Sequence, residues 1–135
     1  KKIVSLMPIV CVDVVVEYKN GVLLVKRSEK PSKGKWWFPG GRMMKYEYPE
    51  KTAIRKTKEE TGLDGRVVKF VGIYVNNFER WHGIKQFSVM LVYHVKARGK
   101  IKLDKTSSEC RVFYGTKPNL HKSVRTLIKK SGVIK

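Results

Sequence analysis

Acidic residues and cysteines are scarce in this sequence of 135 residues. Only 11 residues are Asp or Glu against 30 that are Lys or Arg, so the formal net charge is +19. The two cysteines, Cys11 and Cys110, stand far apart and form no Cys-x-x-Cys or Cys/His cluster. The sequence therefore predicts neither a zinc site nor a disulfide framework, and reduced thiols in a cytoplasmic protein are the expectation.

A long apolar run is also missing. The longest, from Pro8 to Val16, contains Asp13 and falls short of the ~20 residues that a membrane-spanning helix needs. The first residues, 1–7, have neither the apolar stretch nor the small-residue cleavage site of a secretory signal. We therefore expect no membrane partner, and we expect residues 1–135 to form a single domain, as is usual at this length.

The basic residues present in excess predict a surface that attracts polyanions such as nucleotides, nucleic acid or acidic lipid. The lysines are spread from Lys1 to Lys135, however, so a solvated surface without a specific partner explains the composition equally well. Basic and aromatic residues alternate at 33–38 and 78–82, where a base could stack. Nucleic acid stays open as a partner without being favoured.

Hydrophobic patterning predicts several strands and two helices. The dipeptide Asn20-Gly21 indicates a hairpin turn between the first two strands, and the Gly- and Pro-rich segment 28–41 is typical of a functional loop. Pro49 and Gly62 mark the beginning and end of the first helix. This irregular mixture indicates an α+β fold. The expected strands are 9–18, 22–25, 66–75, 86–96 and 111–114, and the expected helices are 49–61 and 119–130.

The first predicted helix carries acidic residues at its carboxyl end. The helix dipole disfavours negative charge there, and Glu59 and Glu60 are adjacent, with Glu47 shortly before the helix. A divalent cation would relieve the repulsion, and carboxylate oxygens suit Mg²⁺ or Mn²⁺. Ion pairs at i,i+4, from Arg55 to Glu59 and from Lys56 to Glu60, would also explain the pattern, and spacing alone favours this simpler interpretation.

The same segment resembles the Nudix box, G-x(5)-E-x(7)-R-E-U-x-E-E-x-G-U with U aliphatic. Two positions depart from it: Lys56 stands where the box has Glu, and Thr57 where it has an aliphatic residue. The resemblance implies a Nudix-type α/β/α sandwich with a mixed β-sheet and the Nudix helix. The matching positions are Gly41, Glu47, Arg55, Glu59, Glu60, Gly62 and Leu63.

A narrower resemblance is to the GDP-mannose mannosyl hydrolases within the Nudix family. It rests on Lys26-Arg27-Ser28-Glu29-Lys30-Pro31, on Phe38-Pro39-Gly40-Gly41-Arg42 and on Asp13, and it continues to the strand near Tyr93. That group lacks the same Glu of the box and relies on one metal. The resemblance implies hydrolysis of GDP-mannose by attack of water at the anomeric carbon, with GDP as leaving group, and it favours a homodimer.

The resemblance also implies roles for individual residues. Glu60, assisted by Glu59 and the Gly41 carbonyl, would hold Mg²⁺, or Mn²⁺, on the diphosphate. Arg27 would stabilise the leaving group, and Arg55 would orient the glutamates. Substrate would be positioned by Asp13, Arg27 and Arg42.

The general base is the point at which the resemblance fails. The related enzymes use a His in the loop before the last strand, and here residues 104–111 contain neither His nor Gln. Glu109 is the nearest proton acceptor and His82 an alternative, whereas His94 and His121 are interpreted as structural. Two other functions stay open: a Nudix pyrophosphohydrolase that attacks the phosphoanhydride, and a Nudix domain that binds nucleotide or RNA without catalysis.

Overall fold

The fold was analysed in a computed structural model that describes residues 3, 6–28, 34–77, 80–81, 84–105, 107–116 and 119–134. Its centre is a seven-stranded mixed sheet in the order β3-β2-β1-β8-β5, with β4 paired to β1 and β9 paired to β2. β1 and β8 are parallel, and the other pairs are antiparallel. A separate small sheet joins β6 (Arg80–Trp81) to β7 (Ile84–Lys85). The strands of the main sheet are β1 (Ile9–Tyr18), β2 (Gly21–Arg27), β3 (Trp36–Trp37), β4 (Gly40–Arg42), β5 (Asp64–Asn76), β8 (Ser88–Arg98) and β9 (Ser107–Phe113).

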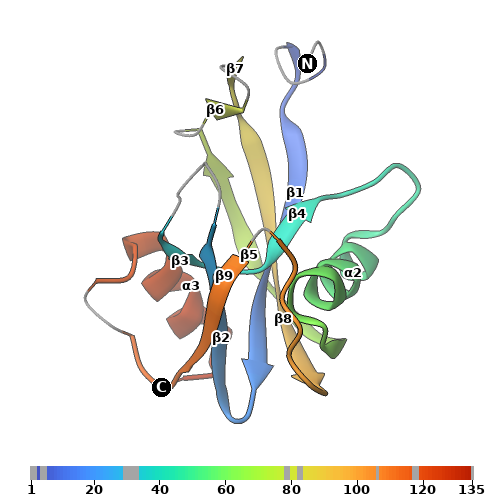
Figure 1. Cartoon of the computed structure of the whole chain (residues 1–135). Helices are drawn as coiled ribbons and strands as arrows, with labels where there is room; N and C mark the ends of the chain where they lie inside the picture. The colour runs from blue at the N-terminus through green and yellow to red at the C-terminus, as the bar shows by residue number, and fades with distance from the viewer. Residues whose placement is uncertain are drawn as a thin grey trace.

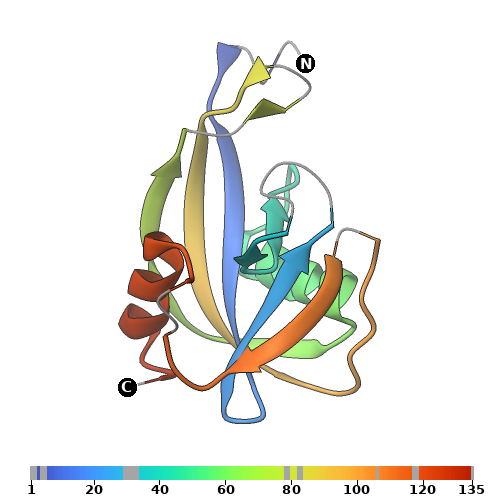
Figure 2. The same ribbon diagram turned by 60° about the vertical axis from the view of Figure 1, so that its left-hand side comes forward.

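The two helices cover opposite faces of this sheet, which confirms the predicted α+β sandwich (Figure 1). Helix α2 (Pro49–Thr61) packs over β1, β5 and β8, and helix α3 (Lys122–Ser131) packs over β5 and β1. Figure 2 shows β5, β8 and β1 as three long, twisted neighbouring strands, with α3 against one face of them. Each face has its own core of buried Val, Leu and aromatic side chains. No described helix is long and apolar enough to cross a membrane.

Local sequence signals set several boundaries as expected. Lys19 and Asn20 adopt positive φ angles of 50° and 67° in the turn between β1 and β2, a conformation that Asn tolerates well. Helix α2 has the predicted bounds, and Gly62 ends it in the left-handed conformation with φ 78°. The thiol of Cys11 is buried in the core, and burial raises its pKa to about 11.

Other boundaries differ from the expectation. Helix α3 begins at Lys122 rather than at 119, because the His121 side chain accepts a hydrogen bond from the Ser123 amide at 3.1 Å and caps the helix there. The four side chains predicted to point inward, Leu120, Val124, Leu127 and Ile128, are nevertheless buried. Strand β9 begins at Ser107 rather than at 111, because its polar first residues pair with β2.

Candidate active site

Arg55 links the loop before α2 to the carboxyl end of the helix. Its Nε and Nη2 donate to the two carboxylate oxygens of Glu47 at 2.7 and 3.0 Å. Its Nη1 donates to Glu59 at 3.0 Å, and Nη2 also donates to the Arg42 carbonyl at 3.0 Å. The predicted orienting contacts of Arg55 are therefore present in this geometry.

Glu47 is held as an anion by this arrangement. The hydrogen bonds from Arg55 lower its pKa to about 2, and the Thr52 hydroxyl and the Met44 amide contribute further hydrogen bonds at 2.8 and 3.1 Å. The pKa of Glu59 is also lowered, first by Arg55 and then by Lys56. Both carboxylates are therefore charged at neutral pH.

Glu60 differs from both, because its side chain is buried. We expected it on the charged face of α2, but only 5% of the residue is exposed. Burial raises its pKa to about 7, although the Gly40 amide donates to Oε2 at 2.9 Å. Oε1 receives no hydrogen bond from the described part of the chain. A buried carboxylate with one free oxygen is suited to binding a cation.

Lys56 lies near both Glu59 and Glu60. Its Nζ lies 3.1 Å from Glu59 Oε1 and 3.7 Å from Glu60 Oε2. A methyl group built on Gly41 would come within 2.6 Å of the Lys56 side chain, so the absence of a side chain at Gly41 allows the lysine to lie there. The ammonium group therefore occupies space between the Gly41 backbone and the two carboxylates.

Two further charges act on Glu60 from other elements. Arg27, at the end of β2, lowers the pKa of Glu60, and Asp104, in the loop between β8 and β9, raises it. That loop is anchored to the end of α2, because the Lys102 amide donates to the Thr61 carbonyl at 2.7 Å. The fold thus brings residues 27, 56, 60 and 104 into one electrostatic site.

The ligands available to a metal are few and are all oxygens. In the part of the chain that the structure describes, no three His, Cys, Asp or Glu side chains are grouped so as to hold a metal ion. Glu60, Glu59 and the Gly41 carbonyl could supply three oxygens. Mg²⁺ commonly takes one or two carboxylates together with waters and substrate phosphates, so this set fits Mg²⁺ or Mn²⁺ bound with a diphosphate.

A family model described as "NUDIX domain" matches residues 7–117. The chain belongs to the Nudix family. It is 42% identical over 69 residues to the ADP-ribose pyrophosphatase of Methanocaldococcus jannaschii. The alignment covers 51% of this chain and 41% of the relative. It is 34% identical over 77 residues to the low-salt glycan biosynthesis protein Agl8 of Haloferax volcanii. That alignment covers 57% of this chain and 49% of the relative. The matches thus span less than half of either relative.

Solved structures agree with this assignment. A Nudix hydrolase from Nitrosomonas europaea superimposes with a TM-score of 0.73 at 26% identity, covering 90% of this chain and 68% of that one. Nudix hydrolases generally use Mg²⁺ or Mn²⁺, ions that prefer oxygen ligands. The family and the fold are thereby established, and the substrate is a separate question.

The structure separates some of the predicted Nudix site residues. Asp13 is buried, accepts a hydrogen bond from the Tyr74 hydroxyl and lies on the α3 face of the sheet. Gly40 lies between the two faces: its amide donates to Glu60, and a methyl group built on it would lie 2.6 Å from Asp13 Oδ1. Arg42 is exposed at the end of β4.

Glu109 is not brought to the Nudix glutamates. It lies in strand β9 rather than in a loop, and it pairs with Lys26 at 3.4 Å. Lys26 lies beside Trp36, and the register between β2 and β9 shifts between Lys26 and Arg27, the residue that acts on Glu60. The alternative base, His82, lies outside the described residues. His94 is buried and contacts Glu17, and His121 caps α3. Both contacts lie within the fold and are of the structural kind expected for these two residues.

Asp104 is the residue that sequence reasoning missed. It stands in the segment in which a base was sought, but its distance along the chain from Glu60 hid their proximity. The loop that carries it has no periodic pattern, and only its anchoring to Thr61 and Gly62 brings the carboxylate to the Nudix helix. A search for any carboxylate in residues 104–111, rather than for the one nearest the missing His, would have found it.

Proposed function

We propose that this protein is a Mg²⁺- or Mn²⁺-dependent hydrolase of nucleoside diphosphate sugars that acts on GDP-mannose or a close analogue. Water attacks the anomeric carbon, and the nucleoside diphosphate leaves. The carboxylates of Glu60 and Glu59 would hold the metal, which would bind the diphosphate, and Arg27 would stabilise the charge that develops on the leaving group.

The single observation that carries this proposal is the position of Lys56. Its ammonium group lies within 4 Å of both Glu59 and Glu60 and against Gly41. A second Mg²⁺ at these carboxylates would meet a positive charge at contact distance, which repels it. Attack at carbon would need only one metal on the departing diphosphate, so a lysine at this position is compatible with it.

A groove beside Lys26, the residue before Arg27 in β2, is a candidate site for the base of a nucleotide substrate. Lys26 and Arg111 approach the Trp36 ring at 5.9 and 5.1 Å from its centre. Two adjoining cavities of about 550 and 400 Å³ share Trp36 and Asn119 in their walls. An exposed aromatic edge with neighbouring cations and an amide is suited to stacking and hydrogen bonding of a base.

The proton acceptor in this proposal is Asp104 instead of Glu109. Asp104 is half-buried and close enough to Glu60 to raise its pKa. A carboxylate beside the metal-bound diphosphate can accept the proton of an attacking water, whereas Glu109 faces Lys26.

A second reaction is favoured by the relative from Methanocaldococcus jannaschii, whose name is ADP-ribose pyrophosphatase. Both acidic positions before the last glycine of the box, Glu59 and Glu60, are retained here. Under this alternative, water attacks the phosphoanhydride and yields a nucleoside monophosphate and a sugar phosphate. With GDP-mannose as substrate, the two reactions differ only in the bond that is cleaved.

Oxygen-labelled water distinguishes the two reactions. The protein is incubated with Mg²⁺ and either GDP-mannose or ADP-ribose, and the products are separated and analysed by mass spectrometry. Label in the free sugar together with unlabelled nucleoside diphosphate supports the proposal. Label in a nucleotide or sugar phosphate supports the second reaction, and absence of turnover on both substrates argues for a binding domain. The predicted homodimer is checked by analytical ultracentrifugation of the same sample.

A further inference from the structure

Six basic residues form a surface that the proposed hydrolase site does not use. We call it the basic face. All six side chains are exposed, and they come from the adjacent strands β5 and β8 and from the last turn of α3. They are Arg66, Lys69, Lys96, Arg98, Lys129 and Lys130.

The register of the sheet places the strand residues on one side. Arg66 is directly opposite Lys96, and Lys69 is opposite His94 in the same β5–β8 ladder. The intervening residues Val95 and Ala97 pack into the core beneath α2, so Lys96 and Arg98 point to the other face. The four strand cations therefore lie on the face that α3 partly covers.

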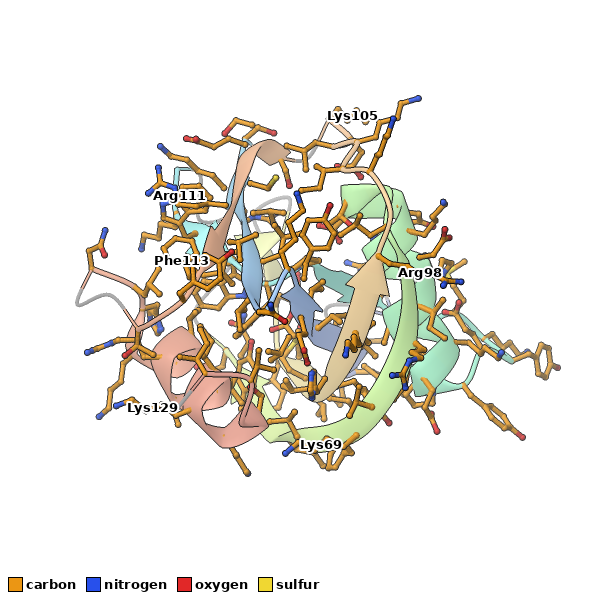
Figure 3. All side chains as sticks on the ribbon, turned by 90° about the horizontal axis from the view of Figure 1, so that it is seen from below. Lys69, Arg98, Lys105, Arg111, Phe113 and Lys129 are labelled. Atoms are coloured by element: carbon orange, nitrogen blue, oxygen red, sulfur yellow. The ribbon has the colours of Figure 1, made fainter. Side chains whose placement is uncertain are left out.

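Helix α3 continues this surface. A methyl group built on Gly72 of β5 would lie 2.8 Å from Lys130 Nζ, and one built on Gly132 would lie 3.8 Å from Lys69 Nζ. Each lysine thus lies across the backbone of the neighbouring element. Viewed from below, Figure 3 labels Lys129 on α3, Lys69 on β5 and Arg98 at the end of β8. The cations follow β5 from its first residues to Gly72.

The positive charge on this face is not neutralised by the described residues. None of the six cations has a carboxylate within 4.0 Å in the part of the chain that the structure describes. The nearby acids have other partners: Asp64 pairs with Lys58 at 3.1 Å, and Glu17 contacts His94 at 2.8 Å. Like charges directly opposite in a sheet destabilise it, so the Arg66–Lys96 pair is a cost to the fold.

We propose that the basic face binds the phosphate backbone of a nucleic acid. A row of cations on β5 and on the adjacent β8 and α3 matches a linear polyanion, whose successive phosphates can each meet a Lys or Arg. A lipid surface would instead favour basic residues around an apolar tip that enters the bilayer. The face is on the opposite side of the sheet from α2 and Glu60, so binding there leaves the hydrolase site open.

Fluorescence anisotropy with labelled single strands tests this. The probes are poly(U) and poly(dT) of about 20 nucleotides, titrated at about 50 and about 200 mM KCl. With about four to six phosphates contacted, affinity should fall about 50- to 300-fold between the two salt concentrations. The variant K69E/K96E should bind at least about tenfold more weakly at the lower salt.

The matched control is K45E/K51E, which changes the net charge equally at two exposed lysines near the start of α2. It should lose less than about threefold in affinity. Equal weakening by both variants would show attraction by net charge alone and overturn the proposal, as would absence of binding at low salt. Binding only to vesicles of phosphatidylserine and phosphatidylcholine would overturn it as well. Circular dichroism checks folding, and K69Q/K96Q replaces the Glu variant if that variant does not fold.

Discussion

The two helices lie on opposite faces of one sheet and are held there by different kinds of contact. Helix α3 buries Val124, Leu127 and Ile128 against one core. Helix α2 buries mainly small or polar side chains. Both end at a glycine in the left-handed conformation, Gly62 and Gly132, so the difference lies in their packing faces. The buried residues of α2 are Thr52, Ala53, Thr57, Glu60 and Thr61.

The hydroxyl groups of Thr57 and Thr61 are satisfied within α2. Thr57 donates to the Ala53 carbonyl at 2.8 Å, and Thr61 donates to the Thr57 carbonyl. Small side chains let α2 lie close to the sheet, where a methyl group on Gly65 would be 3.7 Å from Thr57. This closeness buries the Glu60 carboxylate. Helix α3 stabilises the core, whereas α2 loses some stability by positioning a buried acid.

The largest effect should come from replacing that acid. Glu60→Gln is expected to lower turnover by more than about a hundredfold, since even indirect supports of a metal ligand are worth 10- to 100-fold. It should also weaken Mn²⁺ binding measured by electron paramagnetic resonance. Glu59→Gln is the matched control with a smaller loss. Unchanged turnover and Mn²⁺ affinity in Glu60→Gln would remove Glu60 from the metal site.

The same variant should stabilise the protein when metal is removed with a chelator. The folded pKa of Glu60 is about 7 against an ordinary value of 4.5, so the wild type loses stability as pH rises through this interval. The full loss is on the order of 3 kcal/mol above about pH 7. Urea unfolding at about pH 8 should show Glu60→Gln to be more stable, and no difference from wild type would mean that the carboxylate is solvated.

A truncation in α3 should affect stability without affecting chemistry. Ile128 is fully buried, and Ile128→Ala is expected to cost about 2–4 kcal/mol in the free energy of unfolding. Mn²⁺ affinity should stay within about twofold of wild type, because α3 covers the face opposite α2. If metal affinity falls together with stability, the two faces are coupled and the contrast between the helices does not hold.

Arg27→Ala should have a smaller and more specific effect. An arginine that meets charge developing on the leaving group acts mainly in the transition state, so kcat should fall about 10- to 100-fold with little change in KM. Arg42→Ala, at an exposed position, is the control expected to change KM more than kcat. A rise in KM alone for Arg27→Ala would make Arg27 a binding residue.

The smallest effect concerns the loss of stability at acidic pH. The folded pKa of Glu47 is about 2 because of Arg55, so its contribution is complete above its unfolded pKa of ~4.3 and is lost as pH falls toward 2. Glu47→Gln should flatten the decline of the melting temperature in this interval. Glu50→Gln, at the same end of α2, should leave the decline unchanged, and an equal change in both variants would make the effect one of net charge.

Much of this fold could be predicted from local patterns. Pro49 and Gly62 define α2, Asn20 marks the first hairpin, and the spacing from Gly41 to Leu63 identifies the Nudix box. Those signals work because caps, turns and periodicity act over a few residues. The beginning of strand β9 could not be predicted, because Ser107 and Ser108 have no strand signal of their own and pair only because β2 offers an edge.

The sequence by itself determined the family, the identity of the acidic and basic residues and the position of Lys56 where the box has Glu. Only the tertiary structure decided that Glu60 is buried, that Asp104 acts on it and that Glu109 faces Lys26. The reason is tertiary packing. Which face of a helix or strand is buried, and where a loop is held, depends on the elements that pack against it. Burial and proximity then set the charge of a carboxylate, and neither can be read from spacing along the chain.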